Sequence, residues 1–308
     1  MNKLPRVMDT RTLTYVREVA RLGSYREAAR YLQVSQAALS RPIQLLEIEL
    51  NAVLFARGGS GSTLTDAGRM LLEHLHETMR LLAQARNAVD EVRLQELDQQ
   101  PRGAVTLAIP PSFAMVYGAH LLEVVRLRLP KVRLRILEGA ARQLEEWIRS
   151  GEADLGIVVL PVTANLRWTR IIEDEFTLIG ERRPPRHARN SWTFAQIARL
   201  PMVLPLPPYG SRRLIDAAAA RSGIAFAPVV EVDSLHIVKQ VLSGSGLYTV
   251  LSENVRRSDP FFRSLFHARI DDAPIRELAL AHPVGLPASL ATRALEALIL
   301  EIVAQAPA

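Results

Sequence analysis

The side chains best suited to recognise another molecule through hydrogen bonds lie at the start of one amphipathic segment near the N-terminus. Glutamine can pair with adenine through two hydrogen bonds, and arginine can pair with guanine in the same way. Helical spacing turns both residue types away from the apolar side of this segment. The outward set is Ser35, Gln36, Ser40 and Arg41, with Gln44 one turn further along. These residues predict a surface that reads the edges of DNA bases.

Two shorter helices are expected to hold that segment in place. Residues 9–21 put apolar side chains on one helical face, and a glycine then interrupts the pattern. Ser24 suits the N-cap of a second helix, because Glu27 follows it at the spacing of a capping box. A three-residue turn ends at Ser35, which can cap the third helix. This pattern is typical of a helix-turn-helix; the alternative is a helical hairpin that binds no DNA.

A glycine-rich segment after the third helix predicts a β-hairpin. Residues 54–64 place short apolar stretches around a run of glycine and serine, as in a wing, and Arg57 lies at its base. Residues 1–65 therefore form a predicted all-α domain with a wing. The charge distribution agrees, because residues 1–66 hold nine Lys or Arg and six Asp or Glu, whereas all 308 residues carry only +6. Dense positive charge favours phosphate binding.

A long helical pattern over residues 66–97 follows, and we expect Asp66 to cap it. Its apolar residues recur at near-heptad spacing, which favours a coiled-coil-like contact with a second copy. The alternative is packing against the chain's own body. The polar stretch that ends this segment reads as a hinge, so residues 66–102 form a predicted linker. The stripe consists of Leu71, Leu75, Leu82, Val89 and Val92.

Strands and helices alternate through residues 103–308, which predicts an α/β domain with largely parallel sheets. One sheet or two small lobes would both accommodate the strand count. Ligands bind beyond the carboxyl ends of strands in such folds, and helix starts there favour anions. Ser112 should cap the helix after the first strand. Tyr209, Gly210, Ser211 and Arg212 lie at a similar junction, as does Ser234.

The composition excludes several classes of site. The chain has no cysteine, so disulfides, thiolate metal sites and cysteine redox switches are excluded. The neighbouring histidines, His74 and His76, point in different directions on a helix and suit no shared metal. No nucleophile elbow, Walker loop or zinc-protease motif is present. We therefore expect no enzyme activity, no cofactor and no metal.

No apolar run approaches the roughly 20 residues that a membrane span needs. The first residues also lack the apolar stretch of a secretory signal. We therefore expect a cytoplasmic protein that does not contact membranes.

Several of these motifs together resemble one family. The runs AARYLQVSQAALSR, LEIELNAVLFAR and LTDAG closely resemble the DNA-binding domain of LysR-type transcriptional regulators. The linker and the α/β remainder are similar to that family's linker helix and to its two-lobed, periplasmic-binding-protein-like effector domain. The pieces IPPSFA, EGAARQLEEWIRSGEADLGIV and EVDSLHIVKQVLSGSGLYTVL look most like the branch that includes nitrogen-assimilation control regulators.

The resemblance implies a homotetramer, built as a dimer of dimers, that binds a dyad-symmetric promoter site and contacts RNA polymerase. It implies a small effector between a first lobe (about 103–177 and 281–308) and a second (about 178–280). The resemblance assigns base reading to Gln36, Ser40 and Arg41, and it assigns a contact between the wing and DNA to Arg57. The residues that it places in the effector pocket are Ser112, Phe113, Ala141, Val159, Tyr209, Gly210, Ser211, Arg212 and Ser234.

Two positions depart from the family pattern. Proline often occupies the second position of the recognition helix, where this chain has Ala37, and Pro42 lies inside the helix instead. A proline there removes a backbone hydrogen bond and favours a kink. Ser60 replaces a second wing arginine, which should weaken the salt dependence of binding.

Two other functions fit parts of the sequence. One is a small-molecule binding protein whose N-terminal helices mediate protein contacts, and the other is an α/β enzyme. Ser112 together with Arg142, Arg212 and Arg213 would suit a small carboxylate or another anion as the ligand.

Overall fold

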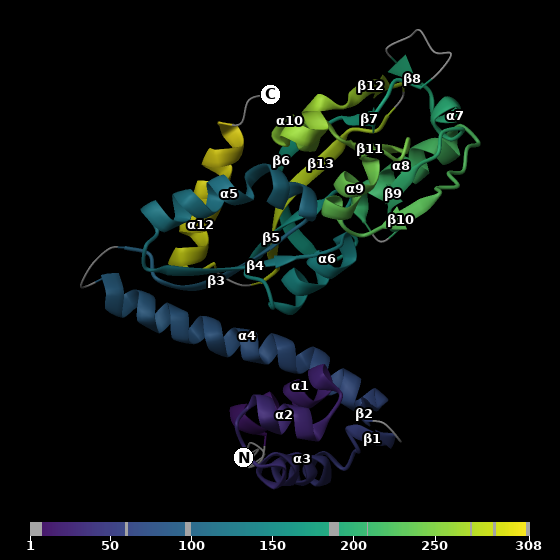
Figure 1. Cartoon of the computed structure of the whole chain (residues 1–308). Coiled ribbons are helices and arrows are strands. Elements are labelled where there is room, and N and C mark those ends of the chain that lie inside the picture. Colours follow the sequence, from purple (N-terminus) through teal and green to yellow (C-terminus); the bar gives the residue numbers. More distant parts are fainter. Residues whose placement is uncertain are drawn as a thin grey trace. The chain divides into compact units, whose positions relative to one another are not determined.

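The computed structural model describes residues 8–58, 61–95, 100–184, 191–207, 209–271, 273–285 and 288–305. The chain forms two compact units, Met1–Arg86 and Asn87–Ala308, and each is described by itself (Figure 1).

The N-terminal unit begins with three helices whose starts follow the sequence signals. Asp9, Ser24 and Ser35 each accept a backbone hydrogen bond as N-caps, which confirms the two predicted serine caps. Gly23 ends the first helix in the left-handed region, where glycine carries no steric penalty. The helices are α1 (Thr10–Leu22), α2 (Tyr25–Tyr31) and α3 (Gln36–Leu50).

A short antiparallel hairpin forms the predicted wing from β1 (Phe55–Gly58) and β2 (Gly61–Leu64). The carboxylate of Glu47, in α3, accepts hydrogen bonds from the backbone of Leu54 at 2.7 Å and of Phe55 at 3.3 Å. On the other strand, the amide of Ser62 donates to the carbonyl of Gly23 at 2.8 Å. The wing is therefore tied to two helical segments of the helix-turn-helix.

The N-cap of the linker helix α4 (Asp66–Gln95) lies one residue earlier than predicted, at Thr65 instead of Asp66. Thr65 accepts from the amide of Gly68 at 3.0 Å, whereas Asp66 lies inside the first turn and pairs with Arg69. Thr65 suits the cap because its hydroxyl also donates to the carbonyl of Val53 at 2.6 Å, which joins the helix start to the segment before the wing.

The predicted apolar stripe of α4 divides into two parts. Leu75 is buried in the core of the N-terminal unit, and Leu71 packs against the same core. Farther along, Leu82 is 43% exposed and Val89 is 69% exposed in the single chain. The side chain of Val92 lies outside the described residues.

The C-terminal unit has two lobes, which we define by their sheets. The first lobe comprises residues 100–174 and 276–305, and its sheet has the strand order β4-β3-β5-β13-β6. Helices α5 and α12 pack on one face and α6 packs on the other (Figure 1). Its elements are β3 (Gly103–Ile109), α5 (Pro111–Arg128), β4 (Val132–Glu138), α6 (Ala141–Ser150), β5 (Leu155–Val159), β6 (Leu166–Asp174), β13 (Arg276–Pro283) and α12 (Leu290–Ala304).

The second lobe comprises residues 175–275. Its main sheet has the order β11-β7-β12-β8, and β9 and β10 form a separate parallel pair. Its elements are β7 (Phe176–Gly180), β8 (Ser191–Trp192), α7 (Phe194–Ile197), β9 (Val203–Pro205), α8 (Gly210–Arg221), β10 (Val230–Val232), α9 (Leu235–Leu242), β11 (Tyr248–Ser252), α10 (Glu253–Ser258), α11 (Pro260–Ser264) and β12 (Phe266–Ile270).

The sheets differ from the largely parallel ones that we predicted. Strands β4, β3 and β5 are parallel, but β13 is antiparallel to both β5 and β6. In the second lobe β7 is antiparallel to β11 and β12. In the first lobe the reason is that the chain returns from the second lobe through β13, which enters the sheet in the opposite direction to β5 and β6. The whole of β13 belongs to that sheet, whereas the predicted boundary at residue 281 divided it.

Candidate base-reading helix and effector cavity

The outward face of α3 carries the predicted base-reading residues in accessible positions. Ser35, Gln36, Arg41 and Gln44 are exposed, and Ser40 is half-buried. Within the described part of the chain, the guanidinium of Arg41 forms no ion pair or hydrogen bond. These side chains are therefore free to contact another molecule.

The opposite face of α3 explains why this surface stays outward. Leu39, Ile43 and Leu46 are completely buried in the core that α1 and α2 share with it. The helix continues from Gln36 to Leu50 through Pro42 without interruption. The helix therefore extends through the proline that we expected to disturb it.

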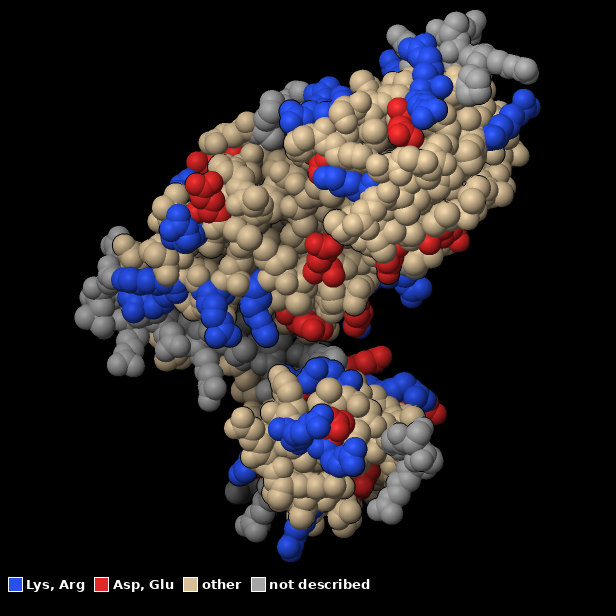
Figure 2. Space-filling model, viewed as in Figure 1, with Lys and Arg blue, Asp and Glu red and all other residues tan. Residues whose placement is uncertain are grey.

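The wing supplies a second surface beside this helix. Arg57 lies in β1 with its backbone opposite Ser62, but its side chain and Ser60 lie outside the described residues. The predicted contact of Arg57 with DNA stays a prediction. Figure 2 shows basic side chains on the surface of the N-terminal unit.

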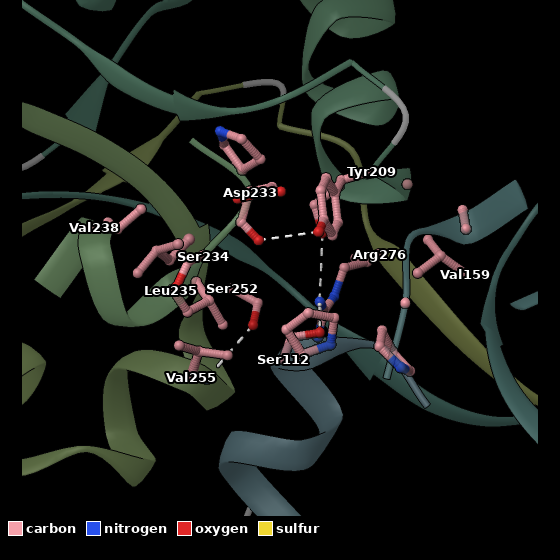
Figure 3. Close-up of a pocket in the computed structure, with 18 of the residues that line it drawn as sticks. Ser112, Val159, Tyr209, Asp233, Ser234, Leu235, Val238, Ser252, Val255 and Arg276 are labelled. Carbon is pink, nitrogen blue, oxygen red and sulfur yellow. Dashed lines mark hydrogen bonds between the residues drawn. The ribbon is translucent and has the colours of Figure 1, made fainter. Parts of the chain in front are cut away.

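A cavity of about 60 Å³ lies between the two lobes of the C-terminal unit. Its lining comes from segments far apart in the sequence, chiefly the starts of helices after strands (Figure 3). That is the position predicted for ligands in this class of fold. The cavity lining includes seven of the predicted residues: Ser112, Ala141, Val159, Tyr209, Gly210, Ser211 and Ser234.

Two predicted residues do not line this cavity. Phe113 is 2% exposed and packs in the core of the first lobe, with its ring 4.8 Å from that of Tyr117. Arg212 binds the carboxylates of Asp216 and Glu231, at 2.8 and 2.6 Å, within the second lobe. Both follow a cavity-lining serine on a helix. A step of one residue turns a side chain by about 100°, so both residues face away from the cavity.

The predicted cap at Ser112 is also wrong. Pro110 occupies the N-cap of α5 without a side-chain hydrogen bond, and Ser112 lies within the first turn. Its hydroxyl instead accepts a hydrogen bond from Nη1 of Arg276 at 2.8 Å.

Arg276 and Asp174 form a buried ion pair beside the cavity that the sequence did not reveal. Nη2 of Arg276 lies 2.9 Å from Oδ2 of Asp174, and the two side chains are 3% and 1% exposed. Nη1 of Arg276 donates to Ser112 of the first lobe and, at 3.5 Å, to Ser211 of the second. Asp174 also accepts from the amide of Asn254 at 3.2 Å. The pair thus contacts both lobes.

Burial dominates the electrostatics of this pair. It lowers the pKa of Arg276, and the carboxylate of Asp174 opposes that effect. Burial also raises the pKa of the neighbouring Tyr117, with a smaller contribution from Asp174. A lone arginine before an apolar strand was the available signal in the sequence, but its partner depends on the pairing of β6 with β13.

Other contacts fix the cavity wall. The hydroxyl of Tyr209 donates to the carbonyl of Asp233 at 2.9 Å, which joins the start of α8 to the turn before α9. Gly210 packs so closely that a Cβ atom there would lie 2.8 Å from Cβ of Val159. Arg213 donates to the carbonyl of Pro161 at 3.1 Å and thereby links the lobes.

Two further classes of site receive no support from the described residues. No group of three His, Cys, Asp or Glu side chains there could hold a metal ion. Among the described helices, none has both the length and the apolar character to cross a membrane.

A helix-turn-helix whose third helix has an accessible polar face, together with a cavity between two lobes, defines a DNA-binding transcription regulator with an effector domain. Residues 10–69 match the family model for bacterial regulatory helix-turn-helix proteins of the lysR family. Residues 98–304 match the model for the LysR substrate binding domain. The chain therefore belongs to the LysR family of transcription regulators.

Curated relatives support this assignment and its predicted branch. The nitrogen assimilation regulatory protein nac of Klebsiella aerogenes is 28% identical over 291 residues, which cover 93% of this chain and 92% of that protein. The nac protein of Escherichia coli (strain K12) is 28% identical, over 82% of this chain and 80% of its own length. A probable RuBisCO transcriptional regulator of Porphyra purpurea is 29% identical, over 80% and 78%.

Solved structures show the same fold. A full-length OxyR variant from Pseudomonas aeruginosa matches with a TM-score of 0.70 and 19% identity, covering 97% of this chain and 95% of that one. Full-length CbnR in complex with its target DNA matches with a TM-score of 0.64 and 18% identity, covering 97% and 99%.

Proposed function

We propose that the protein binds a dyad-symmetric promoter site as a dimer of dimers and changes transcription when a small molecule occupies the cavity between its lobes. The observation that carries the proposal is the outward face of α3, where Gln36, Arg41 and Gln44 are exposed. An exposed row of glutamine and arginine on a recognition helix suits base edges in the major groove.

The exposed part of α4 supports self-association. Leu82 and Val89 are 43% and 69% exposed, although they continue the apolar stripe of the helix. A contact with a second copy would cover them and would place two recognition helices on one DNA duplex. A symmetric pair of such helices calls for a symmetric DNA site.

Further parts of the proposal concern partners and location. The protein acts in the cytoplasm without enzyme activity and contacts RNA polymerase at its promoter. Its relatives bear the names of transcription regulators, which supports a regulatory rather than a catalytic role. The ligand is small and acidic. Neither Arg142 nor Arg213 lines the cavity, so the positive charge nearest to such a ligand comes from Arg276.

The decisive experiment is a gel-shift and footprinting assay with the DNA upstream of the protein's own gene. Gln36→Ala and Arg41→Ala should each cost about 1–3 kcal/mol of specific binding, because each removes a two-bond base contact. Arg126→Ala, an exposed arginine of α5 outside the cavity lining, serves as the matched control. Unchanged footprints with both α3 variants would contradict the assignment.

Arg57→Ala separates base reading from phosphate binding. This variant should weaken binding to all sequences alike and reduce the slope of log K against log salt by about 1. A changed sequence preference would contradict a phosphate role for Arg57. Failure of the unmodified protein to bind any DNA, with or without ligands, would favour a binding protein whose N-terminal helices mediate protein contacts.

A further inference from the structure

The polar side of the effector cavity is built from serine hydroxyls that already accept hydrogen bonds from the protein. Arg276 donates to Ser112 and Ser211, and backbone amides donate to Ser234 and Ser252, each at 3.4 Å. No hydrogen bond donated by these four hydroxyls is found within the described part of the chain. A serine hydroxyl has one hydrogen to donate, so the cavity presents donors that call for an acceptor on the ligand.

The helix starts around the cavity add positive potential. The first residues of α5, α6 and α8 all line it, and none of these helices has a side-chain N-cap. Helices α9 and α10 also start at the cavity, but they are capped by Ser234 and Ser252. Uncapped helix starts leave amide hydrogens available and favour negative charge. The buried guanidinium of Arg276 contacts Ser112 and Ser211 in the first turns of α5 and α8 (Figure 3).

Arg276 provides an independent sign of a ligand site. It is 2% exposed, lines the cavity, and its Nε atom has no hydrogen-bond partner among the described residues. A buried donor without a partner carries the full free-energy cost of its lost hydration. The Nε–H of Arg276 is therefore a donor that the described part of the protein leaves unpaired, and an acceptor on a ligand that reached it would add an interaction that the protein alone lacks.

The rest of the lining limits the ligand to one negative charge. Asp174 already neutralises Arg276, and no second cation occurs among the described lining residues, so the serine hydroxyls and the uncapped helix starts are what remain to stabilise one negative charge. A second negative charge would have no partner and would meet the residue Asp233. Much of the remaining wall is aliphatic and suits a hydrocarbon body: Leu144, Val159, Leu235, Val238, Val250 and Val255.

We propose that the cavity selects a small monocarboxylate with a hydrocarbon body, whose carboxylate bridges Ser112 of the first lobe and Ser211 of the second. Arg276 is a positioning residue, because it holds both serine oxygens through the same nitrogen and turns their hydrogens toward the ligand. This inference rests on the proposed function, since it takes the cavity to be the effector site.

The test compares three probes on the full-length protein by calorimetry and thermal shift. Isovalerate carries one carboxylate, isovaleramide is its neutral counterpart, and 3-methylglutarate carries two carboxylates on a similar branched body. Isovalerate should bind at least tenfold more tightly than either of the others. The inference is overturned if the amide or the dianion binds as tightly as isovalerate, or if none of the three binds.

Variants then test the named residues. Ser112→Ala combined with Ser211→Ala should weaken isovalerate binding at least tenfold, whereas Ser264→Ala, an exposed serine outside the cavity, should leave it unchanged. Unaltered binding in the double variant would overturn the bridging geometry.

A charge-neutral pair, Asp174→Asn with Arg276→Gln, tests positioning without leaving a buried charge alone. A cooperative unfolding transition shows that this pair folds. The preference for isovalerate over isovaleramide should then fall from at least tenfold to less than threefold, a ratio that a purely structural role would not change. A preserved ratio would overturn the role of Arg276. If the double variant fails to unfold cooperatively, the ratio of isovalerate to isovaleramide affinity is measured in Arg276→Lys, which retains the charge, and the same fall to less than threefold is expected.

Gel shifts with the unmodified protein separate this inference from the proposed function. DNA binding without isovalerate binding would refute only the ligand class. Absence of DNA binding would refute the proposed function itself.

Discussion

The base-reading face and the effector cavity are built in opposite ways. The face on α3 consists of exposed side chains from one continuous segment, and Arg41 there has no described partner. The cavity depends on buried groups from distant segments, and Arg276 and Asp174 are 102 residues apart. One surface is available to any partner in solution, whereas the other is held in place by the fold. Substitutions should therefore affect binding alone at α3 and stability as well at the cavity.

The largest expected effect is at the buried ion pair. Asp174→Ala leaves the guanidinium of Arg276 buried without its counter-charge, which should lower the free energy of unfolding by about 3–5 kcal/mol. Denaturant unfolding of the full chain measures this loss. Arg128→Ala is the matched control, because it breaks an exposed ion pair with Glu301, which is expected to contribute about 0–1 kcal/mol. Equal losses in the two variants would contradict the contrast.

A smaller effect is expected at the cavity wall. Gly210→Ala places a Cβ atom 2.8 Å from Cβ of Val159, on the opposite lobe. Such overpacking typically costs about 1–3 kcal/mol, and it should also weaken ligand binding because it displaces the start of α8. Gly118→Ala is the control, because a Cβ atom at that position in α5 meets nothing within 4 Å. The control should be neutral or slightly stabilising, and a matching loss there would show that local crowding is not the cause.

The smallest effect concerns pH. Burial lowers the pKa of His282, and Glu296 opposes the shift. Because the folded state prefers the neutral imidazole, the unfolded chain takes up more protons as pH falls below about 6.5. Stability that is present above that pH should therefore decrease on acidification. Urea unfolding at pH 7.5 and 5.5 should show a smaller pH dependence for His282→Gln than for the unmodified protein; an unchanged dependence would exclude His282 as its source.

The same contrast explains what the sequence could reveal. The helix-turn-helix was predictable because its signals are local: Ser24 and Ser35 cap helices within a few residues of the apolar positions that they precede. Much of the cavity was also predictable, because Ser112, Ser211 and Ser234 lie at junctions between strands and helices. Their neighbours Phe113 and Arg212 were misplaced, since spacing alone does not say which residue of a helix start faces the ligand.

Other features required knowledge of the topology. Strand β6 is hard to recognise in the sequence, because its middle residues are polar, charged or aromatic and are exposed, as an edge strand allows. Without β6, no pattern pairs Asp174 with Arg276. The antiparallel direction of β13 could not be predicted either, because no sequence pattern indicates that the chain crosses back from the second lobe to the first at that point.

The hydrogen bonds that tie the wing to the helices have a consequence for how recognition can diverge. Glu47 fixes the start of β1 and the carbonyl of Gly23 fixes Ser62 in β2. Neither bond uses the outward side chains of α3. Replacing Gln36, Arg41 or Gln44 can therefore alter which bases are read without altering the scaffold that presents them. A family built on this unit can acquire new target sequences through a few surface substitutions, while the hydrogen bonds that hold the wing against the helices stay the same.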